Sequence, residues 1–412
     1  MTDYLVQLCS EPLFEALHNA SSPADLLLEN YLRNKHLGSR ERSFISDLYY
    51  GVIRHKRSLS FLTGTQAPAI LASYYSQIGS NRIERQQALW ESPRLMKTEK
   101  AIRYDLPDWV LPILEKKMPS VDEQEAFVFS IHQPATTDIR VNTLKTNSNA
   151  LKKYFLEKGY DIKQTSWSPT ALRLPPMCVF NASADNRFQG GHFEIQDEGS
   201  QLVSHWCQPK RHELIVDLCG GSGGKSLALS SLMRSTGRIY AFDTARKRLG
   251  KIKPRILRSG ATNITPILIN NLNDDRLSKY NNKADRVLVD APCSGSGTWR
   301  RRPYLKWKYL RNDIVNFQRT QLTILERAAY LVKDSGWLIY ATCSFWSEEN
   351  ELIVDRFLLC HPEFTRISYS DWSMDVIEES QHIKDIQLYT HKHQTDCFFV
   401  SILCKKAKHN FI

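Results

Sequence analysis

Hydrophobic residues in the first part of the chain recur at the spacing of an α-helix. Within "LGSRERSFISDLYYGVIRH" the apolar positions are 44, 45, 48, 49, 52 and 53, which fall on one side of a helix. "SPADLLLENYL" and "SNRIERQQALWE" have a similar pattern, and no strand-like alternation competes with it. Residues 1–110 are therefore predicted to form a helical bundle, which is either a scaffold or a docking module for RNA or protein.

Residues 111–205 mix the two periodicities. "TTDIRVNTLKT" predicts a strand that runs into a turn, and "NALKKYFLEKGYDI" predicts an amphipathic helix that ends near Gly159. "GGHFEIQDEGSQLVSHW" predicts a strand followed by a helix. This block is expected to be a small α+β linking domain.

From residue 206 onwards, short apolar runs alternate with longer helical ones. The runs "LIVDL", "GRIYAFD", "NITPILI", "ADRVLVDAP" and "GWLIYATCS" are separated by segments such as "KSLALSSLMR" and "VNFQRTQLTILERAAYLVKD". This alternation predicts an α/β, Rossmann-like domain over 206–412, with helices on both faces of a mainly parallel sheet. Ligands of such domains bind at the carboxyl ends of the strands.

Composition narrows the class of protein. The 412 residues carry a formal net charge of +11, typical of a nucleic-acid-binding protein but also compatible with an ordinary basic enzyme. The nine cysteines include no CxxC pair, so we expect free thiols, a reducing cytoplasmic location and no metal site. No apolar run approaches the roughly 18 residues that span a bilayer, so no membrane association is expected.

The glycine-rich loop in "LIVDLCGGSGGKS" is a candidate cofactor site. It is not a phosphate-binding P-loop, because Cys219 stands where that motif needs glycine, and Ser226 breaks the GxGxxG pattern. Asp243 closes the next strand, 19 residues after Gly224, near the usual spacing of a carboxylate that binds ribose hydroxyls. The loop therefore favours a nucleoside ligand without phosphates, such as S-adenosylmethionine, over a plain tight turn followed by a solvated Asp.

Two cysteines follow two successive predicted strands. Cys293 lies in "DAPCSG" and Cys343 in "YATCSF", so both thiols are expected over one cleft, near Asp290 at the end of "RVLVD". Asp290 is expected to face the methionine amino group or to orient a substrate base. Asn270 and Asn271 hold the corresponding position after "ITPILI", where an amide can hydrogen-bond an adenine edge.

A pair of thiols at such an edge suits methylation of a pyrimidine. Ring carbon 5 becomes nucleophilic only after a thiolate adds to ring carbon 6, and a base must later remove the carbon-5 proton. A free cysteine has a pKa of about 8.5, so neighbouring backbone N–H groups or arginines would have to favour the thiolate. Each cysteine alone would more commonly be an inert, buried apolar residue.

At these motifs the chain resembles the RsmB/Sun family of RNA cytosine-5 methyltransferases. The resemblance rests on "LPDW" (106–109), "RVNTLK" (140–145), "QDEGSQLV" (196–203), "DAPCSGSGTWRR" (290–301), "TCS" (342–344) and "EENE" (348–351). "LGSRERSFISDLYYGVIRH" resembles the NusB-like RNA-binding domain of bacterial members. The resemblance implies that Cys343 is the nucleophile, that Cys293 assists product release and that Asp290 lies in the active site. The implied cofactor contacts are Cys219, Gly220, Gly221, Ser222, Gly223, Gly224, Lys225, Asp243, Arg248, Asn271 and Asp290.

The sequence departs from the family pattern at two places. The loop usually reads Cys-Ala-Ala-Pro-Gly-Gly-Lys and here reads "CGGSGGK", which predicts a more flexible loop and weaker cofactor binding. A closing Thr-Asp-Gly is "TDC", so Cys397 replaces the glycine. No catalytic group is lost, and activity is expected to survive.

A basic and aromatic segment, "TWRRRPYLKWKYL", follows Cys293 and predicts RNA contact. Cations neutralise phosphates, and aromatic rings stack on unpaired bases. The predicted RNA contacts are Arg300, Arg301, Arg302, Lys306, Trp307 and, in "RVNTLK", Arg140 and Asn142.

The sequence therefore predicts a monomeric S-adenosylmethionine-dependent RNA cytosine-5 methyltransferase. The resemblance to NusB-like domains points to small-subunit ribosomal RNA as its substrate. A transfer RNA or another ribosomal cytosine is the alternative within the class, and a non-catalytic RNA-binding assembly factor is the alternative outside it.

Overall fold

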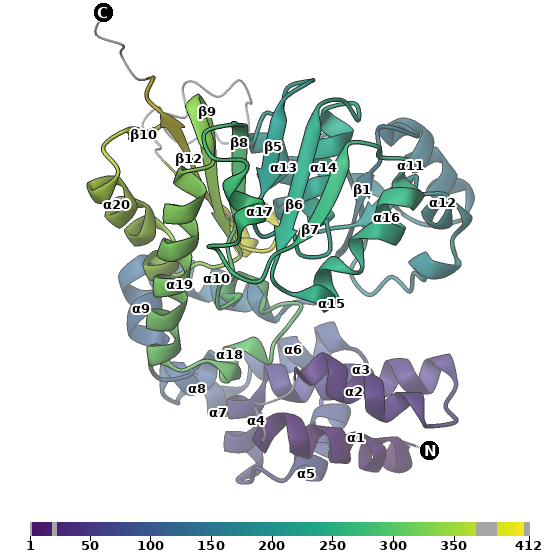
Figure 1. Cartoon of the computed structure of the whole chain (residues 1–412). Helices are drawn as coiled ribbons and strands as arrows, with labels where there is room; N and C mark the ends of the chain where they lie inside the picture. The colour runs from purple at the N-terminus through teal and green to yellow at the C-terminus, as the bar shows by residue number, and fades with distance from the viewer. Residues whose placement is uncertain (1, 19–22, 368–384, 408–412) are drawn as a thin grey trace, which may run out of the picture. The chain divides into compact units, whose positions relative to one another are not determined.

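The structure is a computed structural model that describes residues 2–18, 23–367 and 385–407 (Figure 1). The chain forms two compact units. Residues 1–135 and 298–313 make up the helical unit, and residues 136–297 and 314–412 make up the sheet unit. This division differs from the three predicted segments, because residues 111–135 and a piece from the middle of 206–412 both pack with the helical bundle.

The helical unit confirms the helical periodicity. Ile45, Leu48, Tyr49, Val52 and Ile53 are all buried, so the stripe read from the sequence faces the core. Among the described residues, no helix combines the length and the apolar character needed to cross a bilayer. Its helices are α1 (Thr2–His18), α2 (Ala24–Arg33), α3 (Ser39–Arg54), α4 (Lys56–Thr63), α5 (Pro68–Gln77), α6 (Arg82–Trp90), α7 (Pro93–Met96), α8 (Lys100–Arg103), α9 (Leu111–Lys117), α10 (Val121–His132) and α18 (Leu305–Lys308).

The segment 298–313, which carries α18, is inserted into the helical unit. The indole Nε1 of Trp307 donates to the carbonyl of Ile53 at 2.7 Å, and the guanidinium of Arg54 donates to the carbonyl of Arg300 at 2.7 Å. Trp307 also packs against the hydrophobic core of this unit. A strand-connecting segment of the α/β fold therefore completes the core of a different unit.

Lys306 fixes this segment from the inside. Its side chain is 1% exposed, and its Nζ donates to the carbonyls of Arg54 and Asp105, both at 2.9 Å, and lies 3.0 Å from His132 Nε2. Burial lowers the pKa of Lys306 to about 7. The segment thus holds a cationic group in a site that favours its neutral form.

The sheet unit begins with a four-stranded antiparallel sheet in the order β2-β3-β1-β4. Its residues 136–206 confirm the predicted mixture of strands and helices. The strands are β1 (Thr137–Val141), β2 (Lys163–Gln164), β3 (Ala171–Leu174) and β4 (Phe193–Ile195), and the helices are α11 (Ser148–Glu157), η1 (Ala182–Ala184), α12 (Asn186–Gln189) and α13 (Glu198–Trp206).

The larger sheet has the order β10-β12-β9-β8-β5-β6-β7, with β11 paired to β12. The strands from β9 to β7 are parallel to one another, and β12 is antiparallel to its neighbours. The strands are β5 (Leu214–Asp217), β6 (Arg238–Asp243), β7 (Ile264–Leu268), β8 (Ala284–Asp290), β9 (Val332–Thr342), β10 (Phe364–Arg366), β11 (Ile386–Gln387) and β12 (Phe399–Lys405). The helices are α14 (Gly224–Leu232), α15 (Arg246–Leu249), α16 (Ile252–Ser259), α17 (Asp275–Ser278), η2 (Ser296–Thr298), α19 (Arg311–Ala329), η3 (Ser347–Glu349), α20 (Glu351–Cys360) and α21 (Thr390–His393).

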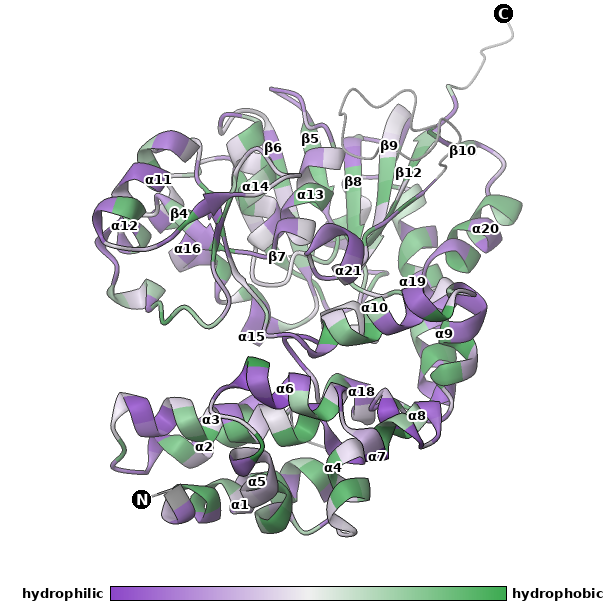
Figure 2. Ribbon diagram, turned by 180° about the vertical axis from the view of Figure 1, so that it is seen from behind, coloured by the Kyte–Doolittle hydropathy of each residue, from purple (hydrophilic) through white to green (hydrophobic). Residues whose placement is uncertain are grey.

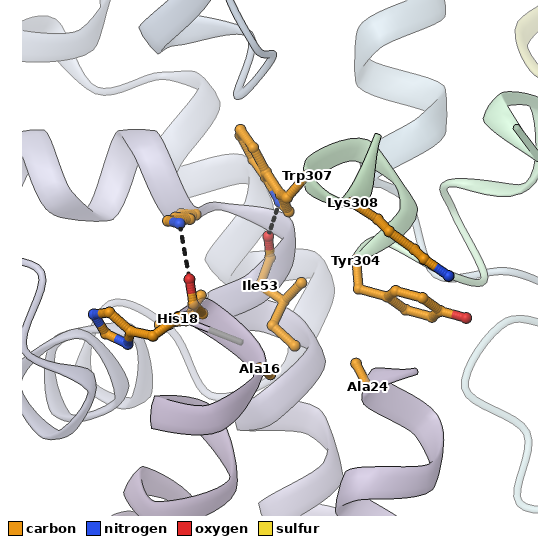
Figure 3. A pocket seen from close by; sticks show the side chains of 9 residues that line it. Ala16, His18, Ala24, Ile53, Tyr304, Trp307 and Lys308 are labelled. Carbon is orange, nitrogen blue, oxygen red and sulfur yellow. Dashed lines mark hydrogen bonds between the residues drawn. The ribbon is translucent and has the colours of Figure 1, made fainter. Parts of the chain in front are cut away.

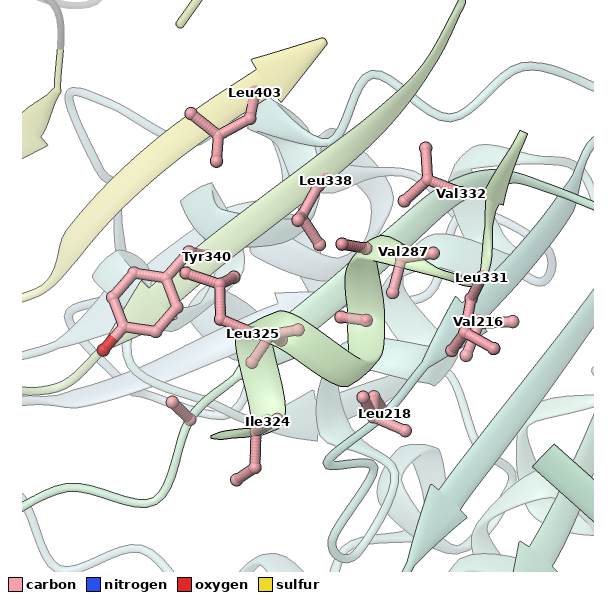
Figure 4. Packing of buried hydrophobic residues seen from close by; sticks show 14 of the residues in the cluster. Val216, Leu218, Val287, Ile324, Leu325, Leu331, Val332, Leu338, Tyr340 and Leu403 are labelled. Carbon is pink, nitrogen blue, oxygen red and sulfur yellow. The ribbon is translucent and has the colours of Figure 1, made fainter. Parts of the chain in front are cut away.

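Helices cover both faces of this sheet, as the alternating pattern predicts. Successive residues of a strand point to opposite faces, so Leu288 of β8 packs with α13 and α14, while Val287 packs with α19 and α20. Figure 4 shows the second cluster, in which Leu325 of α19 lies against Val287 and Leu338. The hydrophobic colouring of the central strands in Figure 2 follows from this burial on both sides. The Rossmann-like fold is confirmed.

The position of Lys306 makes the stability of the helical unit depend on pH. The pKa of a free lysine is about 10.4, so between pH 7 and 10 the unfolded chain binds this proton more tightly than the folded chain. We expect the free energy of unfolding to rise with pH in that window, by at most about 1.4 kcal/mol per pH unit from this residue. In Lys306→Met this contribution should be absent. Urea unfolding of both proteins at pH 7, 8 and 9 measures the difference, with the exposed Lys97→Met as control; an identical pH profile for wild type and Lys306→Met would contradict it.

Candidate active site

The carboxyl ends of β8 and β9 bring two cysteine loops together. The strands are parallel and in register at Asp290 and Ala341, so the chain leaves both strands at the same edge of the sheet. Cys293 follows β8 and Cys343 follows β9, and their sulfurs lie 3.4 Å apart. Both cysteines are free and half-buried. The predicted apposition of the two thiols is therefore present in the structure.

A buried carboxylate ties the two cysteine loops to each other. Glu349 is fully buried and accepts hydrogen bonds from the backbone N–H of Ser294 at 2.8 Å and from its hydroxyl at 2.5 Å. It also accepts from the hydroxyl of Ser344 at 2.7 Å and from Nε2 of Gln321 at 3.1 Å. Each cysteine thus has its next residue bound to the same side chain, which fixes the relative position of the two sulfurs.

Gly297 closes the base of the Cys293 loop against β9 and the "TDC" segment. Its N–H donates to the carbonyl of Cys343 at 3.0 Å, and its carbonyl accepts from the N–H of Cys397 at 2.9 Å. A Cβ at this position would lie 2.3 Å from the carbonyl oxygen of Cys397, so only glycine permits this approach. The Cys397 side chain, which replaces a family glycine, is buried beside the Thr390 hydroxyl at 3.5 Å.

The cation near the thiol pair is a lysine. Nζ of Lys225, on α14, donates to Oδ2 of Asp290 at 2.6 Å. Burial opposes its charge, but Asp290 and then the thiol of Cys343 outweigh the burial, so the pKa of Lys225 is raised overall. The sequence suggested arginines for this role, and Lys225 was expected only to contact a cofactor.

The surroundings of Cys293 hold its thiol in the protonated form. Hydrogen bonding to Cys343 and burial raise the pKa of Cys293 well above its usual value. Cys293 therefore keeps its proton and can donate it toward the sulfur of Cys343. The positive charge of Lys225 interacts with the sulfur of Cys343.

The glycine-rich loop lies between β5 and α14, as predicted. The N–H of Gly221 donates to Oδ2 of Asp243 at 2.8 Å, and Oδ1 of Asp243 accepts from the N–H of Ala245 at 2.6 Å and from Arg248 at 3.2 Å. Gly221 has φ +52°, and only an oxygen of Cys219 and one of Asp243 lie within 4 Å of where its Cβ would be. The loop therefore leaves open space over its backbone beside a carboxylate, which fits a ribose-bearing ligand.

Arg140 and Asn142 support this loop from inside the protein. The guanidinium of Arg140 donates to Oε1 of Gln196 at 2.5 Å and to the carbonyl of Gly224. Nδ2 of Asn142 donates to the carbonyls of Gly191 and Ser259 at 2.7 and 2.8 Å. Both side chains are buried. The prediction that they contact RNA is corrected, because both side chains are buried and donate to groups inside the sheet unit.

The remaining predicted RNA contacts belong to the helical unit and differ in exposure. Lys306 and Arg300 are buried, so neither presents its side chain as a surface phosphate contact. Arg302 is exposed, and Arg301 and Trp307 are half-buried. The prediction for Lys306 is corrected by its internal hydrogen bonds, and RNA contact by the more exposed members stays a prediction.

Asn271 is exposed at the end of β7, and its side-chain oxygen accepts from the N–H of Asn273 at 2.9 Å. Its role toward an adenine stays a prediction.

Glu349 and its partners Ser294, Ser344 and Gln321 were not predicted. The only sequence signal for Glu349 was its place in the motif "EENE", since nothing in the spacing indicates which of three carboxylates turns inward.

Two family models match this chain. The model of the 16S rRNA methyltransferase RsmB/F covers residues 204–404, and that of the ferredoxin-like domain of RsmF/B-like methyltransferases covers residues 106–180. The chain belongs to the RsmB/F methyltransferase family. The protein is therefore an RNA methyltransferase, and S-adenosylmethionine is its methyl donor. The predictions of family and cofactor are confirmed, and the open cradle at Gly221 beside Asp243 fits that cofactor.

Curated relatives are similar to this chain in sequence, and solved structures share its fold. A probable ribosomal RNA small subunit methyltransferase B of Synechocystis is 27% identical over 95% of this chain and 97% of its own length. The human 28S rRNA (cytosine(4447)-C(5))-methyltransferase is 30% identical over 74% of this chain and 38% of its own. The crystal structure of PH0851 has the same fold, with a TM-score of 0.80, 23% identity and coverage of 97% and 98%. A methyltransferase homologue from Pyrococcus horikoshii is 26% identical with a TM-score of 0.63, covering 76% of this chain and 99% of its own.

Replacing Glu349 tests whether it positions the two cysteine loops. In Glu349→Gln one acceptor oxygen becomes an NH2 group, which leaves buried donors of Ser294 and Ser344 without a partner. We expect the free energy of unfolding to fall by about 2–3 kcal/mol and methyl transfer to slow more than RNA binding weakens. Urea unfolding and single-turnover kinetics measure the two effects. Glu326→Gln on α19 is the control; equal behaviour of the two variants would contradict the role of Glu349.

Proposed function

We propose that this RsmB/F-family protein methylates carbon 5 of a cytosine in small-subunit ribosomal RNA, through a covalent bond between Cys343 and ring carbon 6. The observation that carries the proposal is the 3.4 Å approach of the sulfurs of Cys343 and Cys293, beside Lys225 and Asp290. Methylation of a base nitrogen or a ribose oxygen needs no thiol, whereas carbon 5 of a pyrimidine needs a nucleophile at carbon 6.

The first step uses Cys343 as the nucleophile. Its thiolate adds to carbon 6 beside the positive charge of Lys225 and makes carbon 5 electron-rich. Asp290 lies at the same edge of the sheet with 31% of its side chain exposed, where its carboxylate is suited to accept from the exocyclic amino group of cytosine. S-adenosylmethionine, when bound at the glycine-rich loop, supplies the electrophilic methyl group.

The second step needs a base and a leaving thiolate. Once Cys343 is bonded to carbon 6, its sulfur no longer interacts with Cys293 as a hydrogen-bonding partner or a charge, so one cause of the raised pKa of Cys293 is removed while burial remains. Cys293 therefore becomes easier to deprotonate when a base is required. Cys293 gives up its own proton to solvent water, and its thiolate then takes the carbon-5 proton. The electron pair restores the carbon 5–carbon 6 double bond, and the carbon 6–sulfur bond breaks to return a thiolate to Cys343.

The choice of substrate rests on the extent of the matches. The Synechocystis and Bacillus subtilis relatives named for the ribosomal small subunit match over 97% and 95% of their length. The human and mouse relatives named for 28S rRNA match over 38% and 35% of theirs. The relatives named for the small subunit match this chain over nearly its whole length, the helical unit included. This favours a cytosine in small-subunit RNA over a cytosine in large-subunit RNA as the target. The intact thiol pair argues against a non-catalytic assembly factor.

Cys343→Ala tests the nucleophile. Without the sulfur no bond to carbon 6 forms, so methyl transfer should fall by about a thousandfold or more. Covalent trapping on RNA that contains a cytosine analogue blocked at carbon 5 should disappear. Gel electrophoresis under denaturing conditions detects the trapped complex, with the exposed Cys360→Ala as control. Undiminished trapping by Cys343→Ala would refute the assignment.

Cys293→Ala tests the release step. Attack by Cys343 remains possible but removal of the carbon-5 proton slows, so a covalent adduct with unmodified RNA should accumulate. A denaturing gel and mass spectrometry of the adduct measure it. Rapid turnover with no adduct would exclude a release role for Cys293.

Bisulfite mapping of ribosomal RNA from cells with and without the protein identifies the target. One small-subunit cytosine should lose protection when the protein is absent. Loss confined to large-subunit RNA or transfer RNA would overturn the choice of substrate but not the chemistry.

A further inference from the structure

The helical unit contains a small cavity of about 100 Å³ (Figure 3). The cavity lies where the end of α1, the start of α2, the end of α3 and α18 meet. Its aliphatic residues come from the helical bundle, whereas two aromatic rings and one lysine come from the inserted segment 298–313. It is lined by Ala16, Leu17, His18, Ala24, Ile53, Lys56, Tyr304, Trp307 and Lys308.

The described lining residues are mainly basic and include no Asp or Glu, although the carboxylate of Asp25 acts electrostatically on Tyr304. Lys56, Lys308, His18 and Tyr304 are its ionisable members. The inserted segment changes the charge of the whole unit, because residues 1–135 contain 15 Lys+Arg and 16 Asp+Glu, whereas residues 298–313 contain six and one. The positive charge of the helical unit therefore comes from the segment that also supplies the rings of the cavity. An anionic ligand fits this site better than a neutral or cationic one.

A hydrogen bond holds the indole of Trp307 in place before any ligand arrives, and Tyr304 packs against the hydrophobic core of the unit. The N–H bond from Trp307 to the carbonyl of Ile53 fixes the indole, and Figure 3 shows this bond beneath α18. The Nζ atoms of Lys306 and Lys56 lie 5.1 and 6.0 Å from the centroid of the indole ring. Tyr304 is half-buried, and its ring and the Lys308 side chain lie together on one side of the cavity in Figure 3. Fixed rings beside cations form a platform for a base with its phosphates.

We propose that this cavity receives one unpaired nucleotide of the substrate RNA, with its base against Tyr304 and Trp307 and its phosphates at Lys56 and Lys308. The volume suits a single ring system rather than a duplex. Sequence-tolerant stacking on a ring is a general way to hold single-stranded RNA. The inference rests on the proposed function in that it takes the bound nucleic acid to be the RNA that is methylated.

Photocrosslinking locates the contact. A small-subunit ribosomal RNA transcript that carries 4-thiouridine is bound to the full-length protein, irradiated and digested, and the crosslinked peptide is identified by mass spectrometry. Crosslinks to Tyr304 or Trp307 support the inference. Crosslinks confined to other peptides, with RNA still bound, would overturn it.

Variants measure the contribution of the rings. We expect Tyr304→Leu to raise the KM for RNA about tenfold with little change in kcat, because stacking is lost while the cysteine site is untouched. Tyr304→Phe keeps the ring and should behave like wild type. Urea unfolding of both variants separates a loss of stacking from a loss of fold. An unchanged KM in correctly folded Tyr304→Leu would count against the base position.

A double variant measures the contribution of the two lysines to RNA binding. The double variant Lys56→Gln and Lys308→Gln should reduce the salt dependence of RNA binding by about 1.4 in the slope of log K against log salt, the value for two phosphate contacts on a single strand. The exposed pair Lys97→Gln and Lys116→Gln should not change it. Equal slopes for both double variants would overturn the phosphate contacts. If the wild-type protein neither binds nor methylates RNA, the proposed function itself fails, and the two failures are therefore distinguishable.

Discussion

The parallel pairing of β8 with β9 is the constraint on which the active site depends. Parallel strands deliver their carboxyl ends to one edge of the sheet, and the register that aligns Asp290 with Ala341 lets both following loops begin at the same level. A slip of one residue would turn Val287 and Leu338 out of their shared cluster, so the hydrophobic core protects this register. Burial of aliphatic side chains elsewhere in the strands thus stabilises the arrangement in which the two sulfurs lie 3.4 Å apart.

The sequence was most informative where a residue type follows directly from its position along a strand. The strands that end at Asp243 and Asp290 and the loops that carry Cys293 and Cys343 all occur where the apolar runs predict. Their side-chain placement at one edge of the sheet follows from the α/β pattern alone. The glycine-rich loop was found for the same reason, since a glycine cluster between an apolar run and a helix has few other structural explanations.

The sequence was least informative about polar residues that turn inward. Arg140, Asn142 and Lys306 look like surface cations and amides, and each was predicted to contact RNA. In the structure each satisfies backbone carbonyls inside a unit. Burial of such a group is decided by distant partners, namely the carbonyls of Gly224, Ser259 and Arg54, and no local pattern reveals them. Glu349 was missed for a similar reason. The three carboxylates of its motif look like a solvent-exposed acidic run, although one of them is buried and organises the site.

The altered glycine-rich loop shows how hydrogen bonds can replace a lost restraint. Compared with the usual family loop, Ser222 stands in place of proline, and Gly220 and Gly221 stand in place of alanines. Each glycine raises the conformational-entropy cost of ordering the loop by about 1 kcal/mol. The observed loop is held from three sides: Asp243 accepts from Gly221, Arg140 donates to the carbonyl of Gly224, and Arg255 donates to the carbonyl of Ser222 at 2.7 Å. Each such bond contributes about 1 kcal/mol, or more where a charged partner is involved. The free energy that these bonds contribute is similar to the entropic cost of the two glycines, and the partners of the bonds lie outside the loop. The open space over Gly221 is therefore retained. The departure from the family pattern does not by itself remove the cofactor site.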